Sequence, residues 1–131
     1  MPELYKYDYA VIRLVPRVER EEFINVGVII SCPARDFLRA QIAINEKRLI
    51  AFAPQFKIEE LCDYLDTFTK ICAGDEKAGV IGDLTKRERF YWLTSVRSTI
   101  IQTSPVHSGL CADPENELRK LMKKMVFLSD K

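Results

Sequence analysis

The sequence has little of several features that mark special classes of protein. Its 131 residues include 5 glycines, 6 prolines, one histidine and one tryptophan, and they contain no internal repeat or low-complexity tract. The low glycine and proline content, together with 47% hydrophobic residues, excludes collagen-like and disordered chains. A chain of this length can bury roughly two thirds of the surface that its unfolded form exposes. We therefore expect one domain, residues 1–131, with a core of its own.

The sequence also lacks an excess of charge of either sign. Lys and Arg number 20 against 19 Asp and Glu, which leaves a net charge of +1. Because indiscriminate binding of nucleic acid depends on neutralising phosphates, this balance disfavours nucleic acid as a partner. Long hydrophobic runs are missing as well, since the longest, residues 26–30, is far shorter than the roughly 20 residues that span a bilayer. No signal-peptide pattern is visible, so we expect a cytoplasmic protein with no membrane partner.

Close pairs of cysteines are also missing. The cysteines are Cys32, Cys62, Cys72 and Cys111. None of them forms a Cys-x-x-Cys pair, the spacing from which metal sites are usually built, so we predict no metal site. Glycine-rich phosphate loops and dinucleotide fingerprints are not found either, and we predict no cofactor. In a cytoplasmic protein the four thiols are expected to be reduced.

The first third of the chain carries a strong strand pattern. Residues 5–15, 23–32 and 37–44 are rich in β-branched and aromatic side chains, and prolines or turn-forming residues separate them. Short connections favour antiparallel pairing, which predicts a three-stranded meander. The even-numbered positions are apolar, which predicts one oily face on the sheet. These positions are Ala10, Ile12, Leu14, Ile24, Val26, Val28, Ile30, Leu38, Ala40, Ile42 and Ile44.

Helical patterns follow in the second half. Residues 58–72 repeat apolar side chains at three- and four-residue spacing, which predicts an amphipathic helix. Thr85 and Glu88 have the spacing of a capping box and begin a shorter helix, and Asp113 begins a last one. Between them, residues 74–82 lack periodicity and are predicted to be a mobile loop, while residues 98–103 could form a fourth strand.

These elements predict an α+β fold. We expect an antiparallel sheet of three or four strands, the N-terminal meander plus a later strand. The two longer helices, residues 58–72 and 113–125, are expected to cover its oily face, because an apolar sheet face must be buried against another layer.

Two stretches of the chain resemble a known family. The first runs from Tyr7-Asp8-Tyr9-Ala10-Val11-Ile12-Arg13 to Glu22-Phe23-Ile24-Asn25-Val26-Gly27-Val28. The second comprises residues 93–102, 104–109 and 113–118. In this order they resemble DUF3037, a bacterial family of unknown function, over nearly the whole chain. The resemblance implies no particular activity. Members of the family are often encoded beside HipA-like kinases, so the resemblance implies such a kinase as a partner.

A dense polar segment is one candidate site. It contains Arg97, Ser98, Thr99, Ser104 and His107. Guanidinium and hydroxyl donors fit phosphate or carboxylate oxygens, so the segment could form an anion pocket. It could equally be a polar edge strand followed by a Ser-Pro turn with a solvated histidine. His107 could also activate Cys111 or Ser104 as a nucleophile, although no nucleophile elbow accompanies it.

The outer face of the predicted sheet offers two further candidates. Glu22 and Asn25 stand beside Gly27, and a glycine in a strand allows a ligand to approach closely, although it can equally make room for a ring such as that of Tyr9. Aromatic, cationic and amide side chains line the same face and suit a protein partner or single-stranded RNA, unless a helix covers it. They are Tyr7, Tyr9, Arg13, Arg39 and Gln41.

The sequence as a whole favours a non-catalytic interaction or regulatory module that binds a HipA-like kinase through the outer sheet face. Two alternatives stay open. One is a small enzyme or ligand-binding protein that recognises a phosphorylated or nucleotide-like molecule at Arg97, Ser104 and His107. The other is a protein that binds single-stranded RNA on the sheet face.

Overall fold

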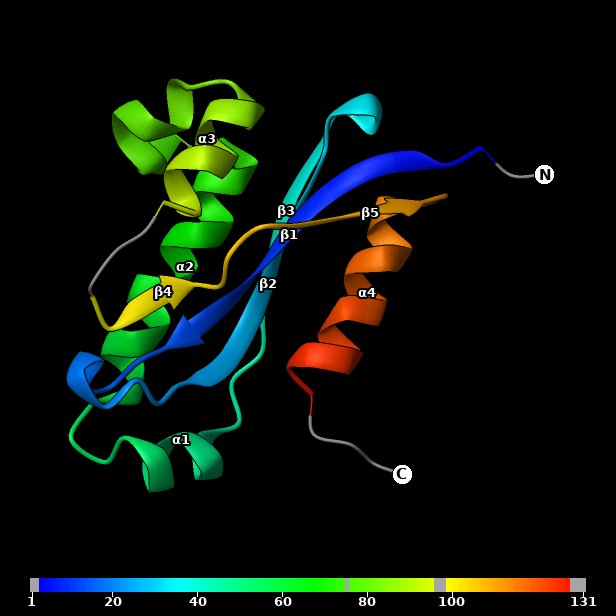
Figure 1. Ribbon diagram of the computed structural model, residues 1–131. Coiled ribbons are helices and arrows are strands. Elements are labelled where there is room, and N and C mark those ends of the chain that lie inside the picture. The colour runs from blue at the N-terminus through cyan, green and yellow to red at the C-terminus, as the bar shows by residue number, and fades with distance from the viewer. Residues whose placement is uncertain (1–2, 75, 96–98, 128–131) are drawn as a thin grey trace.

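An antiparallel sheet forms the centre of the structure, with helices on both of its faces (Figure 1). The computed structural model describes residues 3–74, 76–95 and 99–127. The strands are β1 (Tyr5–Leu14), β2 (Ile24–Cys32), β3 (Phe37–Ile42), β4 (Ile101–Thr103) and β5 (His107–Cys111). The helices are α1 (Glu46–Phe52), α2 (Ile58–Ala73), α3 (Lys86–Leu93) and α4 (Pro114–Met125), with short 3-10 segments at Val18–Arg20, Pro33–Arg35 and Glu76–Asp83. The predicted α+β class with an antiparallel sheet is confirmed.

The N-terminal meander forms as predicted. β2 pairs antiparallel with both β1 and β3, so the first three strands are neighbours in chain order. The connection of β2 to β3 is one 3-10 turn, and the longer connection of β1 to β2 contains another. Each turn is followed by a residue with a positive φ, Glu21 at 57° and Asp36 at 51°. Prolines and turn-forming residues mark these connections in the sequence, which is why the strand boundaries could be predicted within two residues.

A bulge interrupts the pairing of β1 with β2. Ile12 pairs with Gly27 and the next residue, Arg13, pairs with Asn25. Val26 is therefore left without a partner on β1 at this point. An extra residue on one strand of an antiparallel pair changes which face the following side chains occupy.

The bulge divides the apolar residues of β2 between the two faces of the sheet. Ile24 and Val26 belong to one core, together with Ile29, whereas Val28 and Ile30 belong to the other. The prediction that all even-numbered residues of β2 share one face is wrong for the second half of the strand. Period-two alternation fails because the bulge inserts a residue.

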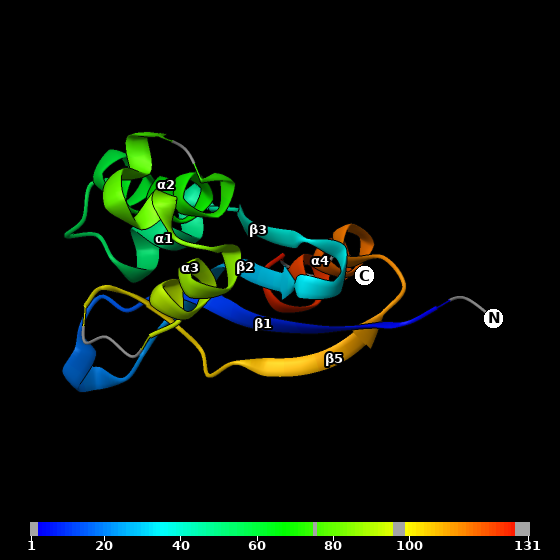
Figure 2. The same cartoon turned by 90° about the horizontal axis from the view of Figure 1, so that it is seen from above.

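The other edge of the sheet is made by two short strands that follow one another along β1. β4 pairs with residues 12–14 of β1, and β5 pairs with residues 5–9. Figure 2 shows β5 lying alongside β1, on the opposite edge from β3. A fourth strand was expected over residues 98–103, and β4 occupies the end of that range. β5 was not predicted, because its sequence resembles a Ser-Pro turn followed by polar residues.

The first core lies between the sheet and helices α1, α2 and α3. Helix α2 contributes its apolar stripe, and β1 contributes its even-numbered residues. The stripe consists of Leu61, Leu65, Phe68, Ile71 and Cys72. This layer is the one that the helical periodicity of residues 58–72 predicts.

The second core lies on the opposite face, between the sheet and α4 (Figure 1). Leu118, Leu121 and Met122 of α4 pack against Val28 and Ile30. The expectation that both longer helices share one face is thereby corrected. The bulge places apolar residues of β2 on the second face of the sheet. That face is therefore apolar as well, and a helix must cover it to bury its side chains.

The caps of α3 and α4 form as predicted. The Thr85 hydroxyl accepts the Glu88 N–H, and the Glu88 carboxylate accepts the Thr85 N–H. Asp113 caps α4 by accepting the Glu115 N–H. The stretch between α2 and α3 was predicted to be a loop, but its described residues form 3-10 turns over Glu76–Asp83, kinked at Gly79. Among the described residues, no helix is long and apolar enough to cross a membrane.

Candidate functional site

The predicted anion pocket does not gather as one cluster in the described residues. Arg97 and Ser98 lie outside those residues. Thr99 uses its hydroxyl to donate to the Ile101 carbonyl, 2.7 Å away. His107 is exposed on β5, and its ring centroid lies 5.4 Å from that of Tyr9.

Ser104 is buried and has a structural role. Its Oγ accepts the Val11 N–H at 2.8 Å and donates to the Pro105 carbonyl at 2.9 Å. The Ser104 N–H in turn donates to the Val11 carbonyl. The hydroxyl thus fastens the bend between β4 and β5 to β1, and both of its hydrogen-bonding capacities are used by backbone groups.

The thiol of Cys111 is poorly suited to act as a nucleophile. The residue is buried where β5 meets the second core, and burial raises the pKa of its thiol to about 11. Burial likewise raises the pKa of Cys72 to about 12. Reactive cysteines have lowered pKa values because the thiolate is the nucleophile, so both residues behave as structural thiols.

Glu22 and Asn25 lie apart in their contacts. Glu22 is exposed and pairs with Arg20, with 2.6 Å between Nε and Oε1. Asn25 donates from Nδ2 to the Met125 carbonyl at the end of α4, while its Oδ1 is buried without a partner among the described residues. The two residues were predicted to hold a common ligand, and the structure gives each of them a different partner.

Gly27 faces another strand, and its close approach is to backbone. A Cβ added there would lie 2.5 Å from the carbonyl oxygen of Gln41 and 2.8 Å from Cδ1 of Ile42. The glycine therefore lets β3 pack closely at the bulge. The ring of Tyr9, for which the glycine could have made room, is not among the nearest atoms.

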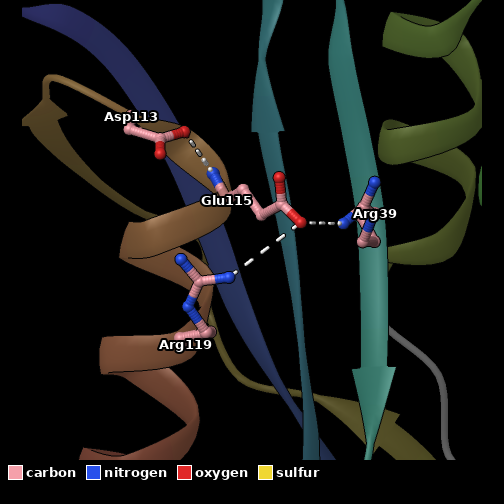
Figure 3. A network of polar contacts seen from close by, with 4 residues as sticks. All are labelled: Arg39, Asp113, Glu115 and Arg119. Atoms are coloured by element: carbon pink, nitrogen blue, oxygen red, sulfur yellow. Dashed lines mark hydrogen bonds and ion pairs between the residues drawn. The ribbon is translucent and has the colours of Figure 1, made fainter.

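The residues predicted to form an open interaction surface lie instead beneath or beside α4. Tyr7 is buried, and its hydroxyl donates to Oε2 of Glu117 at 3.0 Å. Burial and the Glu117 carboxylate both raise the pKa of this phenol. Arg39 donates to Oε1 of Glu115 at 3.2 Å, and Arg119 reaches the same oxygen from one turn further along the helix (Figure 3).

The remaining members of that surface are partly covered as well. Tyr9 and Gln41 are half-buried. Arg13 is half-buried with its guanidinium 4.0 Å above the ring of Phe23, and burial lowers its pKa. The side chains do line up across three strands as predicted, but much of their polar bonding is directed at α4. The face holds a helix of its own chain.

A different surface is hollow and apolar. A groove of about 510 Å³ lies where α2, α3 and the beginning of β4 meet. We call this the aromatic groove, and its lining residues are Tyr64, Thr67, Phe68, Trp92, Leu93, Thr99, Ile100 and Ile101. Tyr64 is 59% exposed and Trp92 is 39% exposed. Phe68 and Leu93 form the floor, because both are buried members of the first core.

Sequence reasoning did not find the aromatic groove, because its walls come from three separate elements. Phe68 belongs to the apolar stripe of residues 58–72, which was predicted to pack on the sheet. Tyr64 lies on the polar side of a helix. Trp92 stands in a short apolar run, and the sequence does not show which residues of that run are buried and which are exposed. The feature that marks the groove is a pair of exposed aromatic rings on neighbouring helices, and it is recognisable only once the helices are packed.

A second hollow of about 360 Å³ lies at the far end of the first face and is polar. Lys6, Asp8, Ser31 and Arg87 line it together with aromatic rings of α3. Two of its charged groups have partners, since the Asp8 carboxylate accepts from the Ser108 hydroxyl and Arg87 donates to the Tyr91 hydroxyl. Arg87 also lies 5.6 Å above the Tyr91 ring. These contacts account for the cluster without a ligand.

The fold is thus an antiparallel sheet between two helical layers, with an aromatic groove on one of them. The family model described as "Protein of unknown function (DUF3037)" matches residues 9–126 of the chain. The chain belongs to this family, as its sequence motifs indicated. No curated protein and no solved structure matches it.

Proposed function

We propose that the chain is a non-catalytic interaction module that binds a partner protein in the aromatic groove. The observation that carries this proposal is the exposure of Tyr64 and Trp92 over a floor of core residues. Tyrosine and tryptophan are among the residues that most often anchor protein interfaces. Exposed apolar surface that is joined to a concave site commonly marks a docking surface.

The side chains with catalytic potential support a non-catalytic role. The Ser104 hydroxyl is engaged by backbone on both sides. Burial raises the pKa of the Cys111 thiol to about 11, which opposes formation of the thiolate at neutral pH. His107 packs on Tyr9 and is solvated, a common situation for a histidine beside a turn.

The partner that we propose is a HipA-like kinase, as the family resemblance implies. The docking surface differs from the one that the sequence favours, because α4 already covers the outer sheet face. A module of this kind would regulate the kinase by occupying part of its surface. The exposed rings of Tyr64 and Trp92 support the groove as the docking surface. The kinase is proposed because of the family resemblance.

The test is native mass spectrometry of the chain mixed with a HipA-like kinase at micromolar concentration. Two exposed apolar residues are each replaced by glutamate. Tyr64 lies in the groove and is the test position, and Leu110 on β5, which is 64% exposed, is the control position. We expect a complex with the unmodified chain and with Leu110→Glu, and loss of the complex with Tyr64→Glu. A carboxylate placed in an apolar contact is desolvated without a partner, which costs binding energy.

Two results would contradict parts of the proposal. If no complex forms with the unmodified chain, the kinase is not the partner. If Tyr64→Glu binds as well as Leu110→Glu, the kinase binds on another surface. Circular dichroism of both variants shows whether they remain folded, which is expected because both side chains are exposed.

A further inference from the structure

The strand β5 forms an open edge of the sheet. It pairs with β1 and with no other described strand, and Figure 2 shows no described element on its other side. Edge strands are commonly protected by charged side chains or prolines, because their free backbone groups can pair with another chain. Residues 106–112 contain no Lys, Arg, Asp, Glu or Pro, although 30% of the whole chain is charged. β5 therefore lacks these protections.

The backbone of β1 shows which of its residues bond toward this edge. The Val11 carbonyl accepts from Ser104, and the Val15 N–H, directly after β1, donates to Ile100. Successive residues of an antiparallel strand direct their backbone groups to opposite sides. The odd-numbered residues of β1 therefore bond toward β4 and β5, and its even-numbered residues bond toward β2.

The same alternation identifies the free backbone groups of β5. His107, Gly109 and Cys111 stand opposite odd-numbered residues of β1, so their backbone groups bond to that strand. Ser108 and Leu110 stand opposite even-numbered residues, so their N–H and C=O groups point away from the sheet. Among the described residues, no hydrogen bond outside the pairing with β1 engages these outward groups. They can accept a further strand.

The side chains on one face of this edge are complementary to themselves. Val106 is 43% exposed and Leu110 is 64% exposed, and they stand two residues to either side of Ser108. When two antiparallel copies of the strand are centred on Ser108, Val106 of each copy faces Leu110 of the other. The outward backbone groups of Ser108 then bond to those of the second Ser108. One register thus satisfies the free backbone groups and pairs the exposed apolar side chains.

The nearest charges do not oppose this pairing. Lys6 and Asp8 of β1 stand opposite Leu110 and Ser108 and have opposite signs. Three strand spacings, about 14 Å, would separate each of them from its counterpart in the second copy, which exceeds the screening length of roughly 8 Å in physiological salt. The Asp8 carboxylate also accepts from the Ser108 hydroxyl of its own chain.

We propose that two copies of the chain pair through β5 across a two-fold axis, which joins their sheets into one continuous antiparallel sheet. A two-fold contact requires a surface that is complementary to itself. β5 meets this requirement in its side-chain register, in its backbone groups and in its lack of charge. None of residues 106–112 lines the aromatic groove, so the dimer leaves the groove free for the partner proposed above.

The experiment measures the mass of the chain in solution by sedimentation equilibrium over a range of concentrations. We expect the unmodified chain to approach twice its monomer mass of 15.1 kDa. Val106→Lys and Leu110→Glu each place a charge opposite an apolar side chain of the second copy. Each is expected to raise the dissociation constant of the dimer roughly tenfold or more. Val80→Glu is the control, since Val80 is 80% exposed and lies between α2 and α3.

A mixture of the two variants tests the register. In a mixed dimer the introduced lysine and glutamate face each other, and the second contact still consists of Leu110 and Val106. An equal mixture of Val106→Lys and Leu110→Glu is therefore expected to restore the dimer that neither variant forms alone. Circular dichroism shows that each variant is folded, which is expected because both side chains are exposed.

Amide exchange measured by NMR gives a second readout that needs no variant. The amides of His107 and Gly109 bond to β1 and should be protected at every concentration. The amides of Ser108 and Leu110 point outward, so their protection should increase with the concentration of the chain.

Four results would overturn the proposal. These are a chain that stays monomeric up to its solubility limit, a dimer that Leu110→Glu leaves unchanged, a mixture of folded variants that stays monomeric, and exchange at Ser108 and Leu110 that does not depend on concentration. A dimer that Tyr64→Glu abolishes and Leu110→Glu does not would show that the copies meet at the aromatic groove instead.

Discussion

Gly27 occupies the point where β3 comes closest to the bulge of β2. The carbonyl oxygen of Gln41 leaves no room for a Cβ, since the two would be 2.5 Å apart. A backbone atom cannot move aside as the end of a flexible side chain can. The residue is therefore fixed by packing of the sheet, and its presence in a strand needs no ligand.

Replacing Gly27 by alanine is expected to lower the free energy of unfolding by about 2 kcal/mol or more, because the strands must separate locally. Gly79→Ala is the matched control. Nothing lies within 4 Å of a Cβ at Gly79, but its φ of 68° strains an alanine. With a ψ of −146° this backbone lies in a region that essentially only glycine adopts, so that strain alone is expected to cost about 1–3 kcal/mol. Urea denaturation of both variants measures the two losses, and a loss well below 1 kcal/mol for Gly27→Ala would contradict the packing explanation.

Single residues of the outer face also show why a polar surface was predicted where a helix lies. Tyr7, Asn25 and Arg39 are a tyrosine, an amide and a cation on one face of the sheet, which is the composition of an interface. The structure uses all three to hold α4, through Glu117, the Met125 carbonyl and Glu115. Composition does not distinguish an interface with a partner from an interface with a segment of the same chain.

At the scale of elements, α3 depends on its capping box, and it carries Trp92 into the groove. Thr85→Ala removes the hydroxyl that accepts the Glu88 N–H. We expect this variant to lose about 1 kcal/mol of stability, measured by thermal or urea unfolding. Trp92, the one tryptophan of the chain, lies in this helix and provides the fluorescence signal for the transition.

The capping box also has a predicted pH dependence. Hydrogen bonds from Thr85 lower the pKa of Glu88 below its ordinary value of 4.5 in the folded state. Its contribution to stability is therefore present above pH 4.5 and is lost as the pH falls through the lowered value. Glu88→Gln should flatten this part of the acid limb of the stability curve. An acid limb that is identical in the variant would show that the box contributes nothing.

The elements whose signals are local could be predicted from the sequence. Prolines and turn-forming residues defined the meander, apolar periodicity defined α2, and Thr85 and Asp113 marked the starts of α3 and α4. The bulge at Val26 could not be predicted, because period two before and after it appears as one continuous pattern. That single residue also decides where α4 packs. β5 escaped notice because a polar edge strand and a polar turn have similar compositions.

At the scale of the whole molecule, charge is distributed unevenly over the helices, although the net charge of the chain is only +1. Exposed acids lie along α2, whereas α4 exposes a run of cations. The cations are Arg119, Lys120, Lys123 and Lys124.

The aromatic groove exists only in the folded molecule, which is why the sequence did not reveal it. Tyr64, Trp92 and Ile100 are separated along the chain and meet only after α2, α3 and β4 have packed together. The polar segment that did attract attention is local in sequence. Its described members serve the backbone, as Ser104 does for Val11, or face solvent, as His107 does.

Hydrogen–deuterium exchange of the chain, free and in complex with a HipA-like kinase, tests the central claim most directly. The account predicts slower exchange on binding in residues 58–73, 86–93 and 99–103, the segments that form the aromatic groove. Residues 107–127, which include β5 and α4, should be unchanged. Protection confined to residues 107–127, with the groove segments unaffected, would contradict the account.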